Sequence, residues 1–250
     1  MENLDIIDAE IRDGLEPAVQ RMLAHFGRPQ WVNERFEYPM REAALVQLLK
    51  AIRVVSALNA VVAILKIGYT IEAATLLRTV DDFLGEISFL MEASEKQRKF
   101  VEHFFDENMD DLIDNPPGSS GITRGEIRQA QTREFVRLSE LAGFTPSAEM
   151  VEKVRKRFRA ISAGYNAYAH GSYHSIMEMY EGGRGFHMRG VPVRTDELRG
   201  VTAQFIVSAL NTFALLGLNM GDEDLFHRLS ERRRHFMETP AIIQPRRAGQ

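Results

Sequence analysis

The residues best suited to catalysis lie between Tyr165 and His174, where three tyrosines, two histidines and a glycine interrupt an apolar and basic helical pattern. Imidazole titrates near neutral pH and tyrosine donates hydrogen bonds, so a proton-transfer role is chemically easy for His170. Gly171 permits a helix break beside it. We therefore take His170 as a candidate catalytic residue, and Tyr165 and His174 as candidate binding residues. The alternative is that both histidines are partly buried structural residues near a helix start.

A second set of chemically useful side chains is the charged line Arg78, Asp82 and Glu86, spaced four residues apart on one predicted helix. Side chains at this spacing share one helix face. One interpretation is a solvated face with ordinary ion pairs; the other is a buried or cleft-lining network in which the arginine fork holds an anionic group. We take Arg78 and Asp82 as further candidate catalytic residues. Asp81 is the next residue round the helix and is expected to point elsewhere.

The histidine spacing also raises a metal-site hypothesis. His170 and His174 lie four residues apart, a spacing at which histidine pairs bind divalent metals. Asp82 and Glu86 on another helix could complete such a site with oxygen ligands, which makes a metal-dependent hydrolase one functional alternative. However, the chain has neither a Glu-x-x-His pair nor a His-Glu-x-x-His run, the signatures of bundle-type di-metal sites and zinc proteases. We predict no metal and no cofactor.

Positive charge is concentrated in two runs and one loop. The first run comprises Lys153, Arg155, Lys156, Arg157 and Arg159, and the second is Arg232 to Arg234. Glu149 and Glu152 precede the first run at pairing distance, which favours a solvated helix face over an RNA-contacting surface. The loop that holds Arg184 and Arg189 is glycine-rich, and such a loop can close over an anion or bind a base. These two arginines are candidate binding residues, and the alternative is a surface hairpin of no chemical role.

These side chains are positioned by a succession of predicted helices. Apolar residues recur every three and four residues, and glycine, proline and capping residues mark the ends. Helices are predicted over residues 4–25, with a kink near Gly14 and Pro17, and over 40–67, 70–93, 94–112, 123–143, 146–168, 196–220 and from 222 onward. Turn chemistry and β-branched residues predict a loop or short hairpin near 181–194. The predicted fold class is an all-α, single-domain bundle of six to eight helices.

The domain organisation follows from the same pattern. We expect an N-terminal helical region and connector over residues 1–39, a helical core domain over 40–236 and a flexible C-terminal tail over 237–250. The connector holds the single tryptophan, Trp31. Pro240 and Pro245 mark the tail.

Composition is typical of a folded protein in a reducing compartment. Hydrophobic residues make up 44% of the chain and charged residues 26%, which are average values for folded soluble proteins. The chain has no cysteine, which excludes disulfides, and its net charge of −4 argues against a dedicated basic nucleic-acid binder. Val201 to Met220 has the length of a membrane span, but its polar residues favour a buried central helix. We expect a cytoplasmic homo-oligomer with no export signal, no membrane association and no disulfide-linked partner.

Two segments carry a resemblance to a known family. The first is residues 72–82, in which a Leu-Leu-Arg sequence is followed by an acid, and the second is residues 162–173, with an Ala-His-Gly centre. Over residues 40–220 the chain resembles a bacterial all-helical family of unknown function. That family is itself similar to HEPN domains, helical modules of which many cleave RNA in toxin and antiphage systems.

The resemblance implies that Arg78, Asp82 and His170 form the polar centre, with Asp82 where the family is expected to have a glutamate. The leading functional hypothesis is therefore a HEPN-like protein that binds or cleaves RNA, with Arg78 orienting phosphate and His170 in proton transfer. The arginine-to-histidine spacing of HEPN ribonucleases is absent at His170. The alternative from a different class is a non-catalytic interaction or regulatory module in which the same three side chains form a structural network.

Overall fold

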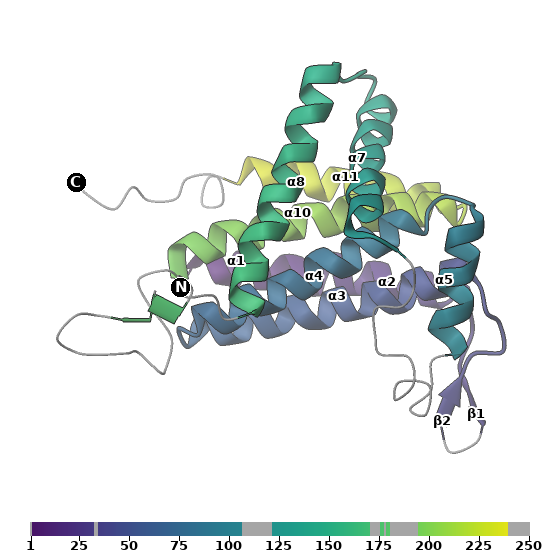
Figure 1. Cartoon of the computed structure of the whole chain (residues 1–250). Coiled ribbons are helices and arrows are strands. Elements are labelled where there is room, and N and C mark those ends of the chain that lie inside the picture. Colours follow the sequence, from purple (N-terminus) through teal and green to yellow (C-terminus); the bar gives the residue numbers. More distant parts are fainter. Residues whose placement is uncertain are drawn as a thin grey trace.

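The chain has an all-α fold with one small antiparallel hairpin, which confirms the predicted fold class (Figure 1). The structure is a computed structural model that describes residues 2–32, 35–106, 122–170, 176–177, 179–180 and 195–239. The loop or hairpin predicted near 181–194 and most of the predicted tail at 237–250 lie outside the described residues.

The N-terminal segment is helical throughout and has a π-helical turn at its centre. It consists of α1 (Glu2–Glu10), the π-helix η1 (Ile11–Leu15) and α2 (Glu16–Leu23). The kink predicted near Gly14 and Pro17 therefore takes the form of a local π-helical turn, with the proline in the first turn of α2. A Cβ atom at Gly14 would meet the side chains of Glu10 and Arg232, which form an ion pair at 2.9 Å. The glycine thus lets an ion pair between the N-terminal segment and the last helix lie close to the backbone.

The predicted connector contains a short hairpin made of β1 (Gln30–Val32) and β2 (Arg35–Glu37). Trp31 pairs with Phe36 across the hairpin, and the two rings meet edge to face with centroids 4.8 Å apart. Both aromatic side chains are exposed.

Two pairs of long helices form the body of the protein. They are α3 (Ala43–Lys66) with α4 (Thr70–Phe89), and α10 (Thr195–Asn219) with α11 (Glu223–Glu238). Gly68 and Gly221 adopt φ values of 88° and 81° in the tight turns that join each pair, a left-handed conformation that glycine adopts most readily. Asp222 then caps α11 by accepting a hydrogen bond from the backbone N–H of Leu225. Their boundaries agree with the predicted ones to within a few residues.

Helices α7 (Arg124–Leu141) and α8 (Ala148–Ala169) form a helical hairpin that stands out from the layer of long helices (Figure 1). Thr123 and Glu126 form the predicted capping box at the start of α7, and Ser147 caps α8. Two further large side chains, Leu141 and Phe144, are exposed near the tip of this hairpin.

The base of the hairpin packs on α4, and one hydrophobic core runs from there to the N-terminal helices. This core buries residues from α1, α3, α4, α10 and α11, among them Ile7, Leu58, Leu77, Phe213 and Leu225. A smaller cluster forms where α5 (Glu95–Asp106) packs beside α3 and α4, through Phe100 and Phe89. The apolar residues of the N-terminal helices therefore share their core with residues 43–236.

Helices α3 and α10 are long and apolar enough to cross a membrane by length and composition alone. In this fold 56% of the most apolar window of α3 and 67% of that of α10 are buried inside the protein. Such helices are weak evidence for a membrane span, because the core helices of soluble proteins have the same character.

Candidate binding site at the base of the helical hairpin

Arg78 and Asp82 form the ion pair that their spacing predicted, but the arginine is buried and not part of a solvated face. Arg78 is 4% exposed, and its Nε donates a hydrogen bond of 2.8 Å to Oδ1 of Asn166 on α8. Its Nη1 pairs with the half-exposed Asp82. Arg78 Nη2 is buried without a hydrogen-bond partner among the described residues. Arg78 is thus the buried member of the charged line and joins α4 to α8, whereas Glu86 pairs with Lys50 of α3.

Asp81 lies at the centre of this network, so the expectation that it points elsewhere is wrong. Its carboxylate accepts two hydrogen bonds from Arg128 of α7, at 3.1 Å to Oδ1 and 2.8 Å to Oδ2. Arg78 Nη1 lies 3.5 Å from the same carboxylate, and Arg128 also donates to Gln131 at 2.5 Å. The physical reason is that α4 is covered by α7 as well as α8, so more than one face of α4 is buried.

His170 lies at the C-terminal end of α8, one turn after Asn166, and its side chain is exposed. Within the described part of the chain, its imidazole makes no hydrogen bond or ion pair with Arg78 or Asp82. The helix ends at Ala169, close to the predicted end at residue 168. The structure therefore brings together Arg78 and Asp82, and His170 is not among the residues that contact them in the described part of the chain. Its role in proton transfer stays a prediction.

Of the four predicted binding residues, the structure describes Tyr165. Tyr165 is buried, its ring packs edge to face on Phe205 with centroids 5.7 Å apart, and burial raises the pKa of its hydroxyl. It therefore acts as a packing residue at the base of α8. His174, Arg184 and Arg189 lie outside the described residues.

Metal ligands do not gather in the part of the chain that the structure describes. There, no group of three or more histidine or acidic side chains could hold an ion. One member of the proposed metal set, His174, lies outside that part.

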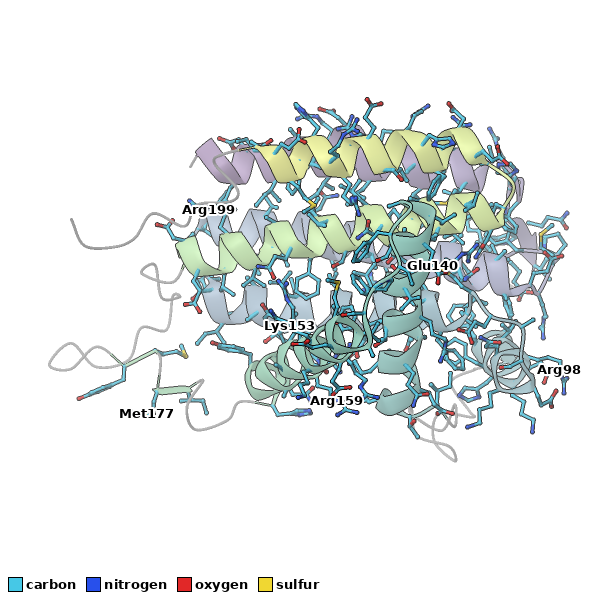
Figure 2. All side chains as sticks on the ribbon, turned by 90° about the horizontal axis from the view of Figure 1, so that it is seen from above. Arg98, Glu140, Lys153, Arg159, Met177 and Arg199 are labelled. Carbon is cyan, nitrogen blue, oxygen red and sulfur yellow. The ribbon has the colours of Figure 1, made fainter. Side chains whose placement is uncertain are left out.

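A partly open cavity of about 320 Å³ lies beside the buried network, lined by α4, α7, α8 and α10 and reached by one side chain of α11. Figure 2 looks down onto the helical hairpin that covers it. The walls are mainly apolar and include Leu84, Phe135, Leu138, Phe158, Ile161 and Phe205. The polar lining groups include Asp81, Gln131, Glu134, Asn211 and Arg233. The network and the cavity are therefore contiguous, because Asp81 and Gln131 belong to both.

Glu134 lines this cavity together with Asp81. Thr212 Oγ1 donates a hydrogen bond of 2.8 Å to Glu134 Oε1, and the Ser88 hydroxyl contacts Oε2. The enclosed carboxylate has its pKa raised to about 7, first because burial disfavours the charged form. Hydrogen bonds from Ser88 and Thr212 and the positive charge of Arg137 act in the opposite direction.

The hydrogen bonds around Ser88 are complete when Glu134 carries a proton. The Ser88 hydroxyl lies 2.9 Å from the carbonyl oxygen of Leu84 and also contacts Glu134 Oε2. A hydroxyl has one proton to donate and can also accept. A protonated Glu134 can donate to Ser88, which then donates to the Leu84 carbonyl. Each polar group in the chain of contacts is satisfied in this state.

Sequence reasoning missed Arg128, Glu134 and Arg233 as site residues. One signal was present for Glu134: it follows Ile127 and Gln131 and precedes Leu138 at spacings of three and four, so it lies on the inward stripe of its helix. Arg233 was noted only as part of a basic run. No family model, curated protein or solved structure matches this chain.

Proposed function

We propose that the protein is a non-catalytic binding or regulatory module whose cavity binds a small amphipathic molecule. The observation that carries this proposal is the cavity of about 320 Å³, because its walls are mainly apolar and a few polar side chains reach it. Small-molecule sites have this composition, and their volumes run from about 300 to 1,000 Å³. A ligand with an apolar body and one polar group fits such a lining.

The state of Arg78 supports a structural role for the charged network. Arg78 is 4% exposed, its Nη1 contacts both Asp81 and Asp82, and its Nε donates to Asn166, so its guanidinium already joins residues of two helices. His170, the proton-transfer candidate, is exposed at the end of α8 and has no described contact with this arginine. These positions favour a structural role for the charged network, which joins the helices, and a binding role for the neighbouring cavity.

The test fills the cavity without touching the charged network. Ser208 is a half-buried lining residue of α10, and Ser208→Trp places an indole in the empty volume. Ala160→Trp adds the same group to an exposed position of α8 and serves as the matched control. Binding of the neutral probe 1-octanol is measured by ligand-observed NMR. We expect saturable binding to the parent chain and to Ala160→Trp, and at least tenfold weaker binding to Ser208→Trp. Equal binding to all three proteins would contradict the proposal.

A second candidate function, RNA binding, is favoured by the exposed basic face of α8. In Figure 2, Lys153 and Arg159 are labelled on this helix, which belongs to the projecting hairpin. Lys153, Lys156 and Arg159 are exposed and have no ion pair with any described residue. Arg155, by contrast, pairs with Glu152. Exposed cations that have no ion pair within the described part of the chain, on a projecting helix, are suited to phosphate contacts.

RNA binding is tested by reversing charge at these positions. Lys153→Glu with Lys156→Glu should weaken binding of a mixed-sequence 20-nucleotide RNA at least tenfold, measured by fluorescence anisotropy at fixed salt. Lys99→Glu with Arg234→Glu makes the same charge change at exposed sites on other helices, and should change affinity less than twofold. Cleavage of the same RNA by the parent chain but not by His170→Ala would support the catalytic form of this function. Equal loss in both charge variants would show only a general electrostatic effect and would contradict a site on α8.

A further inference from the structure

We propose that the molecule bound in the cavity is an organic anion, a small carboxylic acid with an apolar body whose carboxylate pairs with Arg233. This inference rests on the proposed binding function and adds the chemical class of the ligand. The observation behind it is that Arg233 faces the cavity without a described carboxylate partner, whereas the acids that face the cavity already have partners.

Arg233 is the cation of the basic run that lacks a described carboxylate partner. Arg232 pairs with Glu10 at 2.9 Å, and Arg234 pairs with Glu231 at 3.5 Å. Arg233, which lines the cavity, forms no ion pair with a described residue, and its Nη1 donates to Oδ1 of Asn211 at 3.1 Å. Its Nε is buried with no hydrogen-bond partner among those residues. A guanidinium with an unused buried donor is a site for a carboxylate.

The acids of the cavity do not compensate this positive charge. Asp81 is held by two guanidinium groups, those of Arg128 and Arg78, so its charge is already neutralised. Both oxygens of Glu134 are occupied by Ser88 and Thr212, and burial favours its neutral form. Among the described residues that line the cavity, an anionic ligand therefore meets Arg233, which has no ion pair there, and Glu134, whose carboxyl group need not be charged.

The apolar walls of the cavity indicate that the rest of the ligand is a hydrocarbon group. Three phenylalanines, at 135, 158 and 205, line the cavity together with leucine and isoleucine side chains. Burial of an alkyl or aryl group against such a surface stabilises the bound ligand through the hydrophobic effect. A free inorganic anion gains nothing from these walls, so the ligand class is a carboxylic acid with a hydrocarbon body.

A positively charged ligand is the competing possibility for the same cavity. An amine could pair with Glu134 in its ionised form, but it would have to displace the hydroxyls of Ser88 or Thr212 from the carboxylate. It would also lie in a cavity that already contains the charge of Arg233. We therefore use octanoate, 1-octanol and octylamine as probes, because they share a chain length and differ in the charge of the head group.

The experiment measures the affinity of the three probes for the full chain at pH 7 by isothermal titration calorimetry. We expect octanoate to bind at least tenfold more tightly than octylamine. Arg233→Gln, which keeps hydrogen-bond donors and removes the charge, should weaken octanoate at least tenfold and change 1-octanol less than twofold. Arg233→Lys should retain the preference for octanoate. Arg234→Gln, at an exposed position on the same helix, should leave all three affinities unchanged.

The outcomes separate this inference from the binding function on which it rests. Binding of 1-octanol with no preference for octanoate over octylamine would overturn the ligand class and leave the cavity as a binding site. An octanoate affinity that is equal in the parent chain and in Arg233→Gln would overturn the role of Arg233. Failure of all three probes to bind, with no difference between the parent chain and Ser208→Trp, would overturn both proposals.

Discussion

Arg128 and Asp81 join α7 to α4 through a two-point ion pair of 2.8 and 3.1 Å, with both side chains buried. A pair of this kind is costly to desolvate, and its members are stable in the interior only together. The pair lies beside the cavity, because Asp81 also lines it. The position of the helical hairpin and the shape of the cavity therefore depend on the same contact.

Removal of Arg128 should strongly destabilise the fold. Arg128→Ala leaves Asp81 with only the distant Nη1 of Arg78 as its guanidinium neighbour, and a buried charge that loses its partner costs about 3–5 kcal/mol. The free energy of unfolding is measured by urea denaturation. Arg124→Ala, at an exposed position of the same helix, should change it by less than about 0.5 kcal/mol. A loss below about 1 kcal/mol for Arg128→Ala would contradict the anchoring role.

The order and bounds of the helices were predictable because they depend on local signals. Gly68 and Gly221 end helices where their freedom at positive φ is needed, and Thr123 with Glu126 shows its capping box in the sequence. The ion pair of Arg78 with Asp82 was predictable for the same reason, since four residues separate the two along one helix.

The site itself was not predictable, because its contacts join distant parts of the chain. Asp81 meets Arg128 across 47 residues and Glu134 meets Thr212 across 78 residues. No spacing rule links such positions, and only the packing of α7 on α4 and α10 brings them together. His170 was selected for a different reason, namely that histidine is chemically versatile and lies in a conspicuous motif. In the described part of the chain it does not contact Arg78 or Asp82.

Glu134 should make the stability of the protein depend on pH between about 4.5 and 7. Its pKa is raised from 4.5 to about 7 in the folded state, so folding is favoured where the carboxyl group is neutral in both states. This contribution is complete below pH 4.5 and is lost as the pH rises to about 7. The loss amounts to about 2–3 kcal/mol.

Glu134→Gln isolates this contribution from the other titrating groups. The amide keeps the size of the side chain, can donate to Ser88 and can accept from Thr212, but it does not titrate. Unfolding free energies of both proteins are measured by urea denaturation from pH 4 to pH 8. We expect the variant to gain stability relative to the parent chain as the pH rises through this range, with no further change above about pH 8. A constant difference across the range would contradict a raised pKa.

Gly85 should be essential to the close approach of α7 to α4. A Cβ atom there would overlap Cγ2 of Ile127 on α7, so Gly85→Ala should destabilise the fold by about 1–3 kcal/mol despite the better helix propensity of alanine. Gly164 lies in α8, where a Cβ atom would meet nothing within 4 Å. Gly164→Ala should therefore stabilise the protein by about 0.5–1 kcal/mol. Thermal unfolding of both variants tests the contrast, and equal effects would contradict it.

Lys50 should hold α5 against α3 and α4, because its buried ammonium group has both aromatic and ionic partners. It lies 5.3 Å from the ring centroid of Phe83 and 5.1 Å from those of Phe100 and Phe104, and pairs with Glu86 at 2.5 Å. Phe100 and Phe104 belong to α5. Desolvated cation–π contacts contribute about 2 kcal/mol or more.

Two substitutions separate these contributions. Lys50→Met keeps an apolar stem but removes the cation from the three rings, so hydrogen exchange of the α5 amides should accelerate at least tenfold. Glu86→Gln removes the ionic partner, which is partly exposed, and leaves the cation in place, so its effect on the same amides should be smaller. Lys99→Met, at an exposed position of α5 itself, is the control and should leave exchange unchanged. If Glu86→Gln accelerated exchange as much as Lys50→Met, the ion pair and not the aromatic contacts would hold the helix.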